Sequence, residues 1–207
     1  MPTYFISDTH FGHKNLLLFE RKAFATIEEH DEYIINAINK IVKPTDTLIH
    51  LGDVGNVEMV RRLNGHKELI LGNHDQRPIK EYLGYFAKVH ETPFYFKKNI
   101  MLSHEPHPVP EGVLNVHGHL HGAKLNSTNH LNLSAWCVGY KPIREDEICR
   151  IAANLGKTNY HFLQEWFADK YVFTVDRDDV VTFEGGLVDL EKTRELRVLK
   201  FAKTTEV

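Results

Sequence analysis

The sequence predicts an α/β domain that begins with a largely parallel β-sheet. In its first third, three short apolar runs alternate with two segments of helical spacing, and this β–α–β–α–β order is typical of parallel strands joined by helices. After residue 89 the pattern changes to short strands, which a second sheet facing the first would accommodate. The chain has 207 residues, 42% of them hydrophobic and 26% charged, enough for one sizeable domain with a buried core.

The first half of the chain supplies the parallel strands and their helices. Isoleucines recur at helical spacing over residues 26–42, where Thr26 and Glu29 form a capping box at the helix start. Pro44 then breaks the helical pattern. The other elements expected here are strands over residues 4–6, 47–51 and 68–71, and helices over about 57–63 and 81–89.

The second half is expected to be richer in short strands. Residues 94–96 and 100–102 are typical of a hairpin, and two further strands and a helix follow at 114–116, 131–133 and 145–154. The tail differs in character and is expected to contain a helix, a hairpin and a last strand, over residues 162–171, 172–183 and 196–201. We therefore divide the chain into a main domain, residues 1–156, and a C-terminal extension, residues 157–207.

Residues of metal-ligand type gather in five short motifs, each at the end of a predicted strand. The motifs are Asp8-Thr9-His10, Gly52-Asp53, Gly72-Asn73-His74-Asp75, Ser103-His104 and Gly118-His119-Leu120-His121. Residues two apart at a strand end point to the same side, so each of the pairs Asp8/His10 and His119/His121 could chelate one ion. Because sites in open α/β sheets form outside the carboxyl ends of the strands, all five motifs are expected to meet in one crevice.

The ligand types indicate which ions would bind and what they would do. Carboxylate, imidazole and amide ligands without thiolate favour borderline divalent ions, with Mn first and Fe, Zn, Ni or Co as alternatives. Asp53 is the carboxylate best placed to bridge two ions. Two ions about 3.5–4 Å apart clamp a phosphoryl group and lower the pKa of a shared water toward 7, and that hydroxide can then attack phosphorus.

The five motifs, in this order, resemble those of the calcineurin-like metallophosphoesterases, whose pattern is D-x-H, G-D, G-N-H-[DE], a lone His and G-H-x-H. The resemblance covers about residues 1–150, and the stretch 6–13 looks like the short bacterial and phage branch of that family. It implies a four-layer sandwich of two mixed β-sheets flanked by helices, to which the tail would add a small β-rich extension.

The resemblance also implies a role for each motif residue. His74 would be the catalytic histidine that faces the scissile phosphate and protonates the leaving group, and Asp75 would orient it. Asp53 would bridge the two ions. The remaining implied ligands are Asp8, His10 and His121 for the first ion and Asn73, His104 and His119 for the second.

Three further residues near the motifs are candidates for binding the substrate. His13 could line the pocket, with helix capping or packing as the alternative. Arg77 could grip a phosphate group, or it could be a solvated loop arginine. His117 lies just before a Gly-His pair, where contact with a ligand residue or with the backbone is the expected role.

These observations predict a metal-dependent phosphodiesterase or phosphatase that acts on a small, nucleotide-like phosphoester. The net charge is −3 and no basic run is present, so nucleic acid is not indicated as a partner, and a nuclease is the second enzymatic hypothesis. A protein-binding scaffold without catalysis is the alternative from another class. Retention of His74 and of every ligand argues against it.

Composition also bears on where the protein works. No apolar run approaches the roughly 20 residues that cross a bilayer, and the N-terminus lacks the features of a signal peptide. Cys137 and Cys149 form neither a disulfide framework nor a zinc pattern. We therefore expect a cytoplasmic protein without a membrane partner, in which the extension adds edge strands, a lid or a contact between copies of a homo-oligomer.

Overall fold

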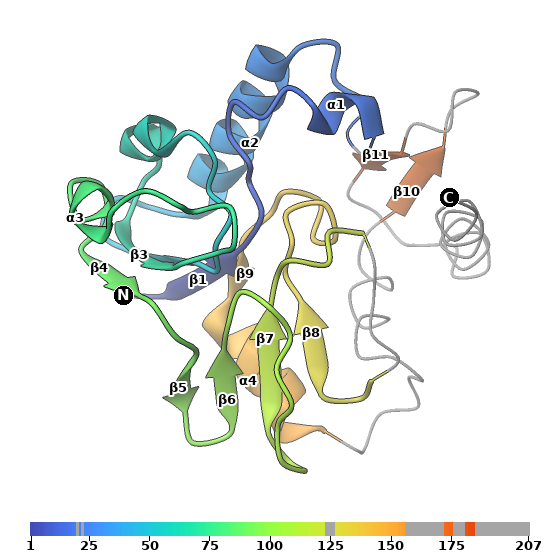
Figure 1. The fold of residues 1–207 in the computed structure, drawn as a ribbon. Coiled ribbons are helices and arrows are strands. Elements are labelled where there is room, and N and C mark those ends of the chain that lie inside the picture. Colours follow the sequence, from blue (N-terminus) through green and yellow to red (C-terminus); the bar gives the residue numbers. More distant parts are fainter. Residues whose placement is uncertain (20, 22, 123–126, 156–171, 176–180, 185–207) are drawn as a thin grey trace.

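The computed structural model describes residues 1–19, 21, 23–122, 127–155, 172–175 and 181–184. Figure 1 shows two β-sheets with helices beside them. The first sheet has five strands in the order β4-β3-β2-β1-β9, and the second has four in the order β5-β6-β7-β8. Each sheet mixes parallel and antiparallel neighbours. The predicted fold class, two mixed sheets flanked by helices, is therefore confirmed.

Three of the strands in the first sheet, β1 to β3, are those that the alternating pattern predicted. Its four parallel members are β1 (Thr3–Ile6), β2 (Thr47–His50), β3 (His66–Ile70) and β4 (Lys88–His90). β9 (Ile143–Arg144) joins them antiparallel to β1. The helix expected over residues 81–89 is wrong for most of its length, because the helix found there ends at Tyr82 and residues 88–90 pair with β3 as β4, a parallel edge.

The second sheet combines a hairpin with two parallel strands. The hairpin of β5 (Phe94–Lys97) and β6 (Ile100–Leu102) was predicted, and β7 (Leu114–His117) and β8 (His130–Asn132) follow it in parallel. β10 (Val172–Val175) and β11 (Val181–Glu184) form the predicted tail hairpin. The helix over 162–171 and the strand over 196–201 lie outside the described residues.

The helices begin and end for recognisable local reasons. Thr26 caps α2 (Ile27–Ile41) by accepting a hydrogen bond from Glu29 N, which is one half of the predicted capping box. In the other half the structure differs, because Glu29 Oε2 accepts from Ala25 N, one residue before the cap. The helix expected over 57–63 is the 3-10 helix η1 (Val57–Arg62). The other helices are α1 (Leu16–Phe19), α3 (Ile79–Tyr82) and α4 (Glu145–Ala153). None of the helices in the described ranges is long and apolar enough to cross a membrane.

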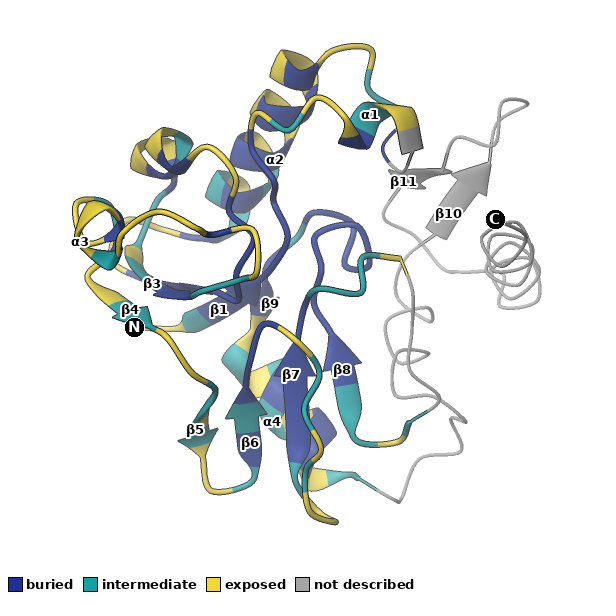
Figure 2. Cartoon of the chain, in the orientation of Figure 1, coloured by how far each residue is buried: buried dark blue, intermediate teal, exposed yellow. Residues whose placement is uncertain are grey.

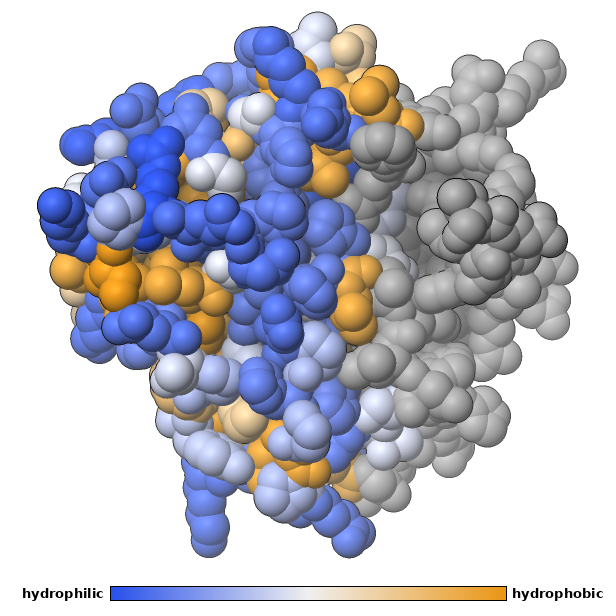
Figure 3. Space-filling model, in the orientation of Figure 1, coloured by the Kyte–Doolittle hydropathy of each residue, from blue (hydrophilic) through white to orange (hydrophobic). Residues whose placement is uncertain are grey.

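The core lies between the sheets and beneath the helices (Figure 2). Phe5 of β1 meets Phe96 of β5 edge-to-face at 5.2 Å, so the two sheets touch through aromatic side chains. The face drawn in Figure 3 is mostly hydrophilic with apolar patches between. Exposed large hydrophobic residues among those described lie on different elements: Met1, Leu18, Tyr33, Leu83 and Tyr95.

One backbone contact joins the sheets where the site forms. Ser7, directly after β1, bridges to Ser134 beyond β8. Its N–H donates to Leu133 O at 3.0 Å, and its carbonyl accepts from Ala135 N at 2.7 Å. The carboxyl ends of β1 and β8 are thereby held side by side.

Candidate metal centre

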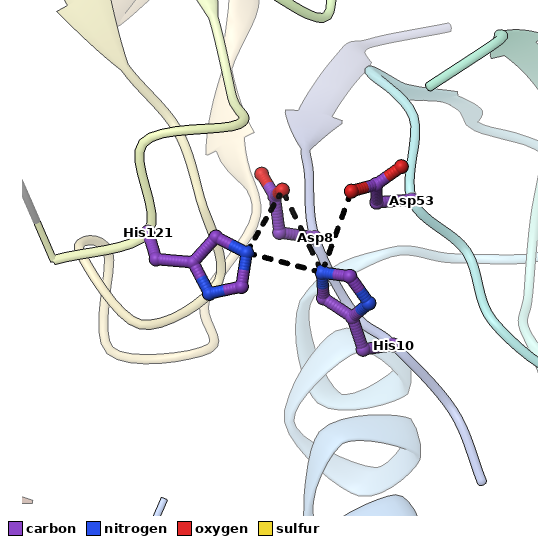
Figure 4. Close-up of side chains that lie close together, drawn as sticks. All are labelled: Asp8, His10, Asp53 and His121. Carbon is purple, nitrogen blue, oxygen red and sulfur yellow. Dashed lines mark hydrogen bonds and ion pairs between the residues drawn. The ribbon is translucent and has the colours of Figure 1, made fainter. Parts of the chain in front are cut away.

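The first group of convergent side chains consists of Asp8, His10, Asp53 and His121 (Figure 4). One potential ligand atom from each lies within 4.8 Å of the others. His10 Nε2 is 3.2 Å from His121 Nε2, 3.5 Å from Asp53 Oδ2 and 3.9 Å from Asp8 Oδ1. Three of the four are buried, and together they could hold one divalent cation.

The second group lies on the other side of Asp53 and consists of Asn73, His104 and His119. Asn73 Oδ1 is 2.9 Å from His104 Nε2 and 3.0 Å from His119 Nδ1. The two histidine nitrogens are 3.3 Å apart. One amide oxygen and two imidazole nitrogens therefore converge on one point.

Asp53 joins the two groups through a single oxygen. Its Oδ2 is 3.5 Å from His10 Nε2 in the first group and 3.5 Å from His104 Nε2 in the second. Its Oδ1 accepts a hydrogen bond from His74 N at 2.9 Å, which fixes the rotation of the carboxylate. One carboxylate oxygen thus faces both groups.

The histidines at positions 119 and 121 do not share a group, which corrects the expectation that each His or Asp pair chelates one ion. His121 lies with Asp8 and His10, whereas His119 lies with Asn73 and His104. The pairing assumed an extended strand, but φ is +66° at His119 and +47° at His121, so the backbone turns between them. The structure therefore places one of these histidines in each group.

Left-handed backbone is concentrated at these residues. Six non-glycine residues of the described chain have positive φ, and five belong to the two groups: Asp8, His10, Asp53, His119 and His121. Each such conformation costs on the order of 1–3 kcal/mol and persists only where the surroundings enforce it. The strain therefore marks these loops as built for the placement of their side chains.

Two glycines of the motifs are required by close approach of the carboxylates. A Cβ on Gly72 would lie 2.2 Å from Asp53 Oδ1, and one on Gly118 would lie 2.3 Å from Asp8 Oδ2. Neither neighbour can retreat without leaving its group. Only glycine therefore fits before Asn73 and before His119 while the two carboxylates keep their places.

Hydrogen bonds outside the groups orient the ligand atoms. The Nδ1–H of His104 donates to Leu51 O at 2.8 Å, which turns Nε2 toward the second group. Asp8 Oδ2 accepts from Ser134 Oγ at 2.8 Å and from His119 N at 3.0 Å. Asp8 Oδ1 is therefore the oxygen that faces His10 and His121.

Asp75 holds the backbone around Asp53. Its Oδ2 accepts from Asp53 N at 2.8 Å and Gly72 N at 2.9 Å, and its Oδ1 accepts from Val54 N at 3.1 Å. Asp75 was expected to orient His74. Among the described residues, the hydrogen bonds of its carboxylate go to these three amides instead, so its structural effect is exerted on the Asp53 loop.

The ionisation states suit cation binding at Asp53 and His10. Burial, followed by the charge of His121, lowers the pKa of His10 to about 2, so its ring is neutral. Burial alone would raise the pKa of Asp53, but hydrogen bonds from His104 and His74 outweigh it and hold that pKa below its usual range. Burial likewise opposes charge on His104, yet Asp53 and Asp8 raise its pKa to about 9. A cation at His104 would therefore displace a proton.

The predicted catalytic and substrate residues fall in different places. His74 is exposed beside the first group, with ring centroids 5.6 Å from His10 and 6.2 Å from His13. His13 Nδ1 is 3.5 Å from His10 Nδ1. His117 is buried, and its Nδ1 bonds to Gly118 O at 2.8 Å, a backbone contact as expected. Arg77 is paired on the surface with Glu81 at 3.7 Å.

Sequence reasoning missed several residues that support the groups. Arg21 is wholly buried and donates to the carbonyls of Asp8 and Thr9. Ser134 bonds Asp8, and buried His50 bonds Thr9 Oγ1 at 3.0 Å. A polar residue just after the apolar 131–133 strand was the available signal for Ser134. Nothing local distinguishes Arg21 from a solvated arginine.

Comparison with known proteins gives relatives without an assigned activity. No protein-family profile matches the chain. An uncharacterized protein of Methanocaldococcus jannaschii is 29% identical over 72% of this chain and 89% of its own length. The gene 66 protein of Mycobacterium phage L5 is 27% identical over 65% of this chain and 87% of its own length. A crystal structure of a protein of unknown function from Aquifex aeolicus matches with a TM-score of 0.59 and 28% identity, covering 72% of this chain and 98% of that one.

Proposed function

We propose that the protein is a dinuclear metal-dependent phosphoester hydrolase. The observation that carries this proposal is the position of Asp53 Oδ2, 3.5 Å from a histidine nitrogen of each group. Two ions about 3.5–4 Å apart that share a carboxylate are typical of enzymes that cleave phosphoesters. A structural metal site, by contrast, needs one closed set of ligands and no such bridge.

The donor atoms fit two divalent cations of the borderline class. The first group offers two carboxylates and two imidazoles, and the second offers the shared carboxylate, two imidazoles and the neutral amide of Asn73. This all-oxygen-and-nitrogen set suits Mn, Fe, Zn, Ni or Co. When bound, such ions supply Lewis acidity toward the phosphoryl group and an activated water at neutral pH.

The residues of the chain would divide the remaining work. Asp53 and the two groups would hold both ions. The backbone N–H of His74 donates to Asp53 Oδ1, which holds this residue beside the first group. Because the residue is exposed, its ring has access to solvent and to a substrate bound there. Its role in the proposal is to bind a phosphoryl oxygen and to protonate the leaving oxygen.

We propose a small phosphodiester or phosphomonoester as the substrate, with nucleic acid as the alternative that the same assay tests. The chain carries net charge −3, and Arg77, the arginine of the motif loop, is paired with Glu81. Long nucleic acids bind through many phosphate contacts with Lys and Arg. A screen of aryl mono- and diesters, cyclic nucleotides and single-stranded DNA separates these classes.

The direct test is metal-dependent hydrolysis of bis(p-nitrophenyl) phosphate. Chelation should abolish turnover, and Mn²⁺ should restore it. Asp53→Asn should lose turnover together with bound metal, whereas the matched control His66→Ala, exposed on β3, should retain both. Turnover that survives complete removal of divalent metal would refute the proposal.

A further inference from the structure

A buried network of charged and polar side chains lies behind the first group of ligands. It consists of Arg21, His30 and Asp31, whose side chains are almost completely inaccessible to solvent. Arg21 precedes α2, while His30 and Asp31 are the fourth and fifth residues of that helix. None of the three belongs to the five motifs.

The network begins and ends on the segment that carries Asp8 and His10. Arg21 donates from Nη1 to Thr9 O at 3.0 Å and from Nη2 to Asp8 O at 2.5 Å. At the other end, Asp31 Oδ2 accepts from Gly12 N at 2.9 Å. The network therefore binds both ends of the turn formed by residues 8–12.

His30 connects the arginine to the aspartate. Its Nδ1 is 2.8 Å from Asp31 Oδ1 and its Nε2 is 2.5 Å from Arg21 Nη1. Because the carboxylate can only accept, Nδ1 carries the hydrogen and the Nε2 lone pair receives the guanidinium. The arrangement places an obligate cation, a neutral ring and an anion in line inside the protein.

Such burial is expensive unless each polar atom gains a specific partner. Arg21 also lies 5.6 Å from the ring centre of Tyr140, which adds a cation–π contact. The cation gains the backbone carbonyls of Asp8 and Thr9 as partners. Asp8 is left-handed, with φ +56°, and so is His10, which follows Thr9, with φ +47°. The amides of Asp8, His10 and Phe11 donate to carbonyls of residues 52–54, the loop after β2, and these bonds also hold the turn.

We propose that Arg21, His30 and Asp31 form a positioning network that holds Asp8 and His10 in the conformation that binds the first metal ion. The network touches neither ion nor substrate. It acts through the two carbonyls and the Gly12 amide. The link to metal affinity rests on the metal centre proposed above, whereas the link to the conformation of the turn does not.

The test compares Arg21→Met and Asp31→Asn with Ile38→Ala, a truncation of a wholly buried α2 residue that has no polar contact with the turn. Amide hydrogen exchange is measured for His10, Phe11 and Gly12, with Leu69 of β3 as an internal reference. Both network variants should exchange faster at the turn than Ile38→Ala does, with Leu69 alike in all three. They should also bind the first equivalent of Mn²⁺ about 10–100-fold more weakly in titration calorimetry.

The outcomes separate the two proposals. Turn exchange no faster than in Ile38→Ala overturns the positioning network, and so does faster exchange with unchanged Mn²⁺ affinity. Wild-type protein that binds no divalent metal refutes the metal centre, while the exchange data still decide whether the network holds the turn. Should Arg21→Met fail to fold, Asp31→Asn and Arg21→Lys carry the comparison. The lysine variant keeps the charge but loses the two-pronged donor, so it should fall between wild type and the methionine variant.

Discussion

Replacement of Asp75 by Asn tests what this residue supports. Its two carboxylate oxygens accept three backbone amides, from Asp53, Val54 and Gly72. An Asn side chain keeps one acceptor oxygen and turns an N–H toward amides that also donate. At least one amide hydrogen bond is lost outright, and those that remain lose their charge.

The magnitude follows from the hydrogen bonds lost. A hydrogen bond to a charged group contributes about 1.5–3 kcal/mol, and Asp75 is only 7% exposed, so solvent replaces little of the loss. The outright loss of one such bond destabilises the fold by about 1.5–3 kcal/mol. For a chain of this size that lowers Tm by about 3–12 °C.

The assay is thermal unfolding together with metal content. Because the amides belong to the Asp53 loop, Asp75→Asn should lose bound metal as well as stability. Glu68→Gln is a matched control, since Glu68 is a partly exposed carboxylate on β3 that pairs with Lys88 and His90. A variant with normal Tm and normal metal content but slow turnover would refute the reasoning, and would assign Asp75 to the orientation of His74 instead.

Three further predictions use other parts of the site. His74→Ala should keep near-normal metal content, measured by mass spectrometry, while turnover falls about 10²–10⁴-fold; loss of metal would make His74 a ligand. The first group has two carboxylates and the second shares one, so Mn²⁺ should bind in two phases, and Asn73→Ala should remove only the weaker one. A single-phase titration with one equivalent would contradict the two-phase prediction. Burial lowers the pKa of His50 to about 3, against about 6.5 in the unfolded chain. The neutral His50 ring therefore contributes fully to the free energy of unfolding above pH 6.5, and this contribution is lost as pH falls toward 3. Urea unfolding should show that the free energy of unfolding falls between pH 7 and pH 4.5, and that this fall is smaller by about 2 kcal/mol in His50→Gln than in the wild type. The same fall in both proteins would refute the assignment.

The parts of the fold that sequence predicted are those determined by local pattern. The Thr26 cap and the hydrogen bond that it accepts from Glu29 N lie within four residues of chain, and the structure has both as expected. The strand ends that carry Asp8, Asp53 and His104 were likewise marked by short apolar runs. In contrast, β4 depends on pairing with β3 some twenty residues away, so a helical pattern was inferred instead.

The same distinction holds within the site. The ligand residues could be named because each stands in a compact motif. The division of His119 and His121 between the groups depends on left-handed backbone, which spacing in an assumed strand does not reveal. Arg21 supports Asp8 through backbone carbonyls, and backbone groups carry no signature of their partners in the sequence.

The ligand residues come from both sheets, so ions bound to them would connect one sheet to the other. Asp8, His10, Asp53 and Asn73 extend from the first sheet, whereas His104, His119 and His121 extend from the second. An ion held by Asp8 and His121 would close a loop of more than a hundred residues, which in the backbone is fastened here by Ser7 and Ser134. Ions that bind only the folded chain add stability in proportion to the logarithm of their concentration. The ions of the proposed centre would thus also cross-link the two sheets, and removal of the metal would let the sheets separate more easily.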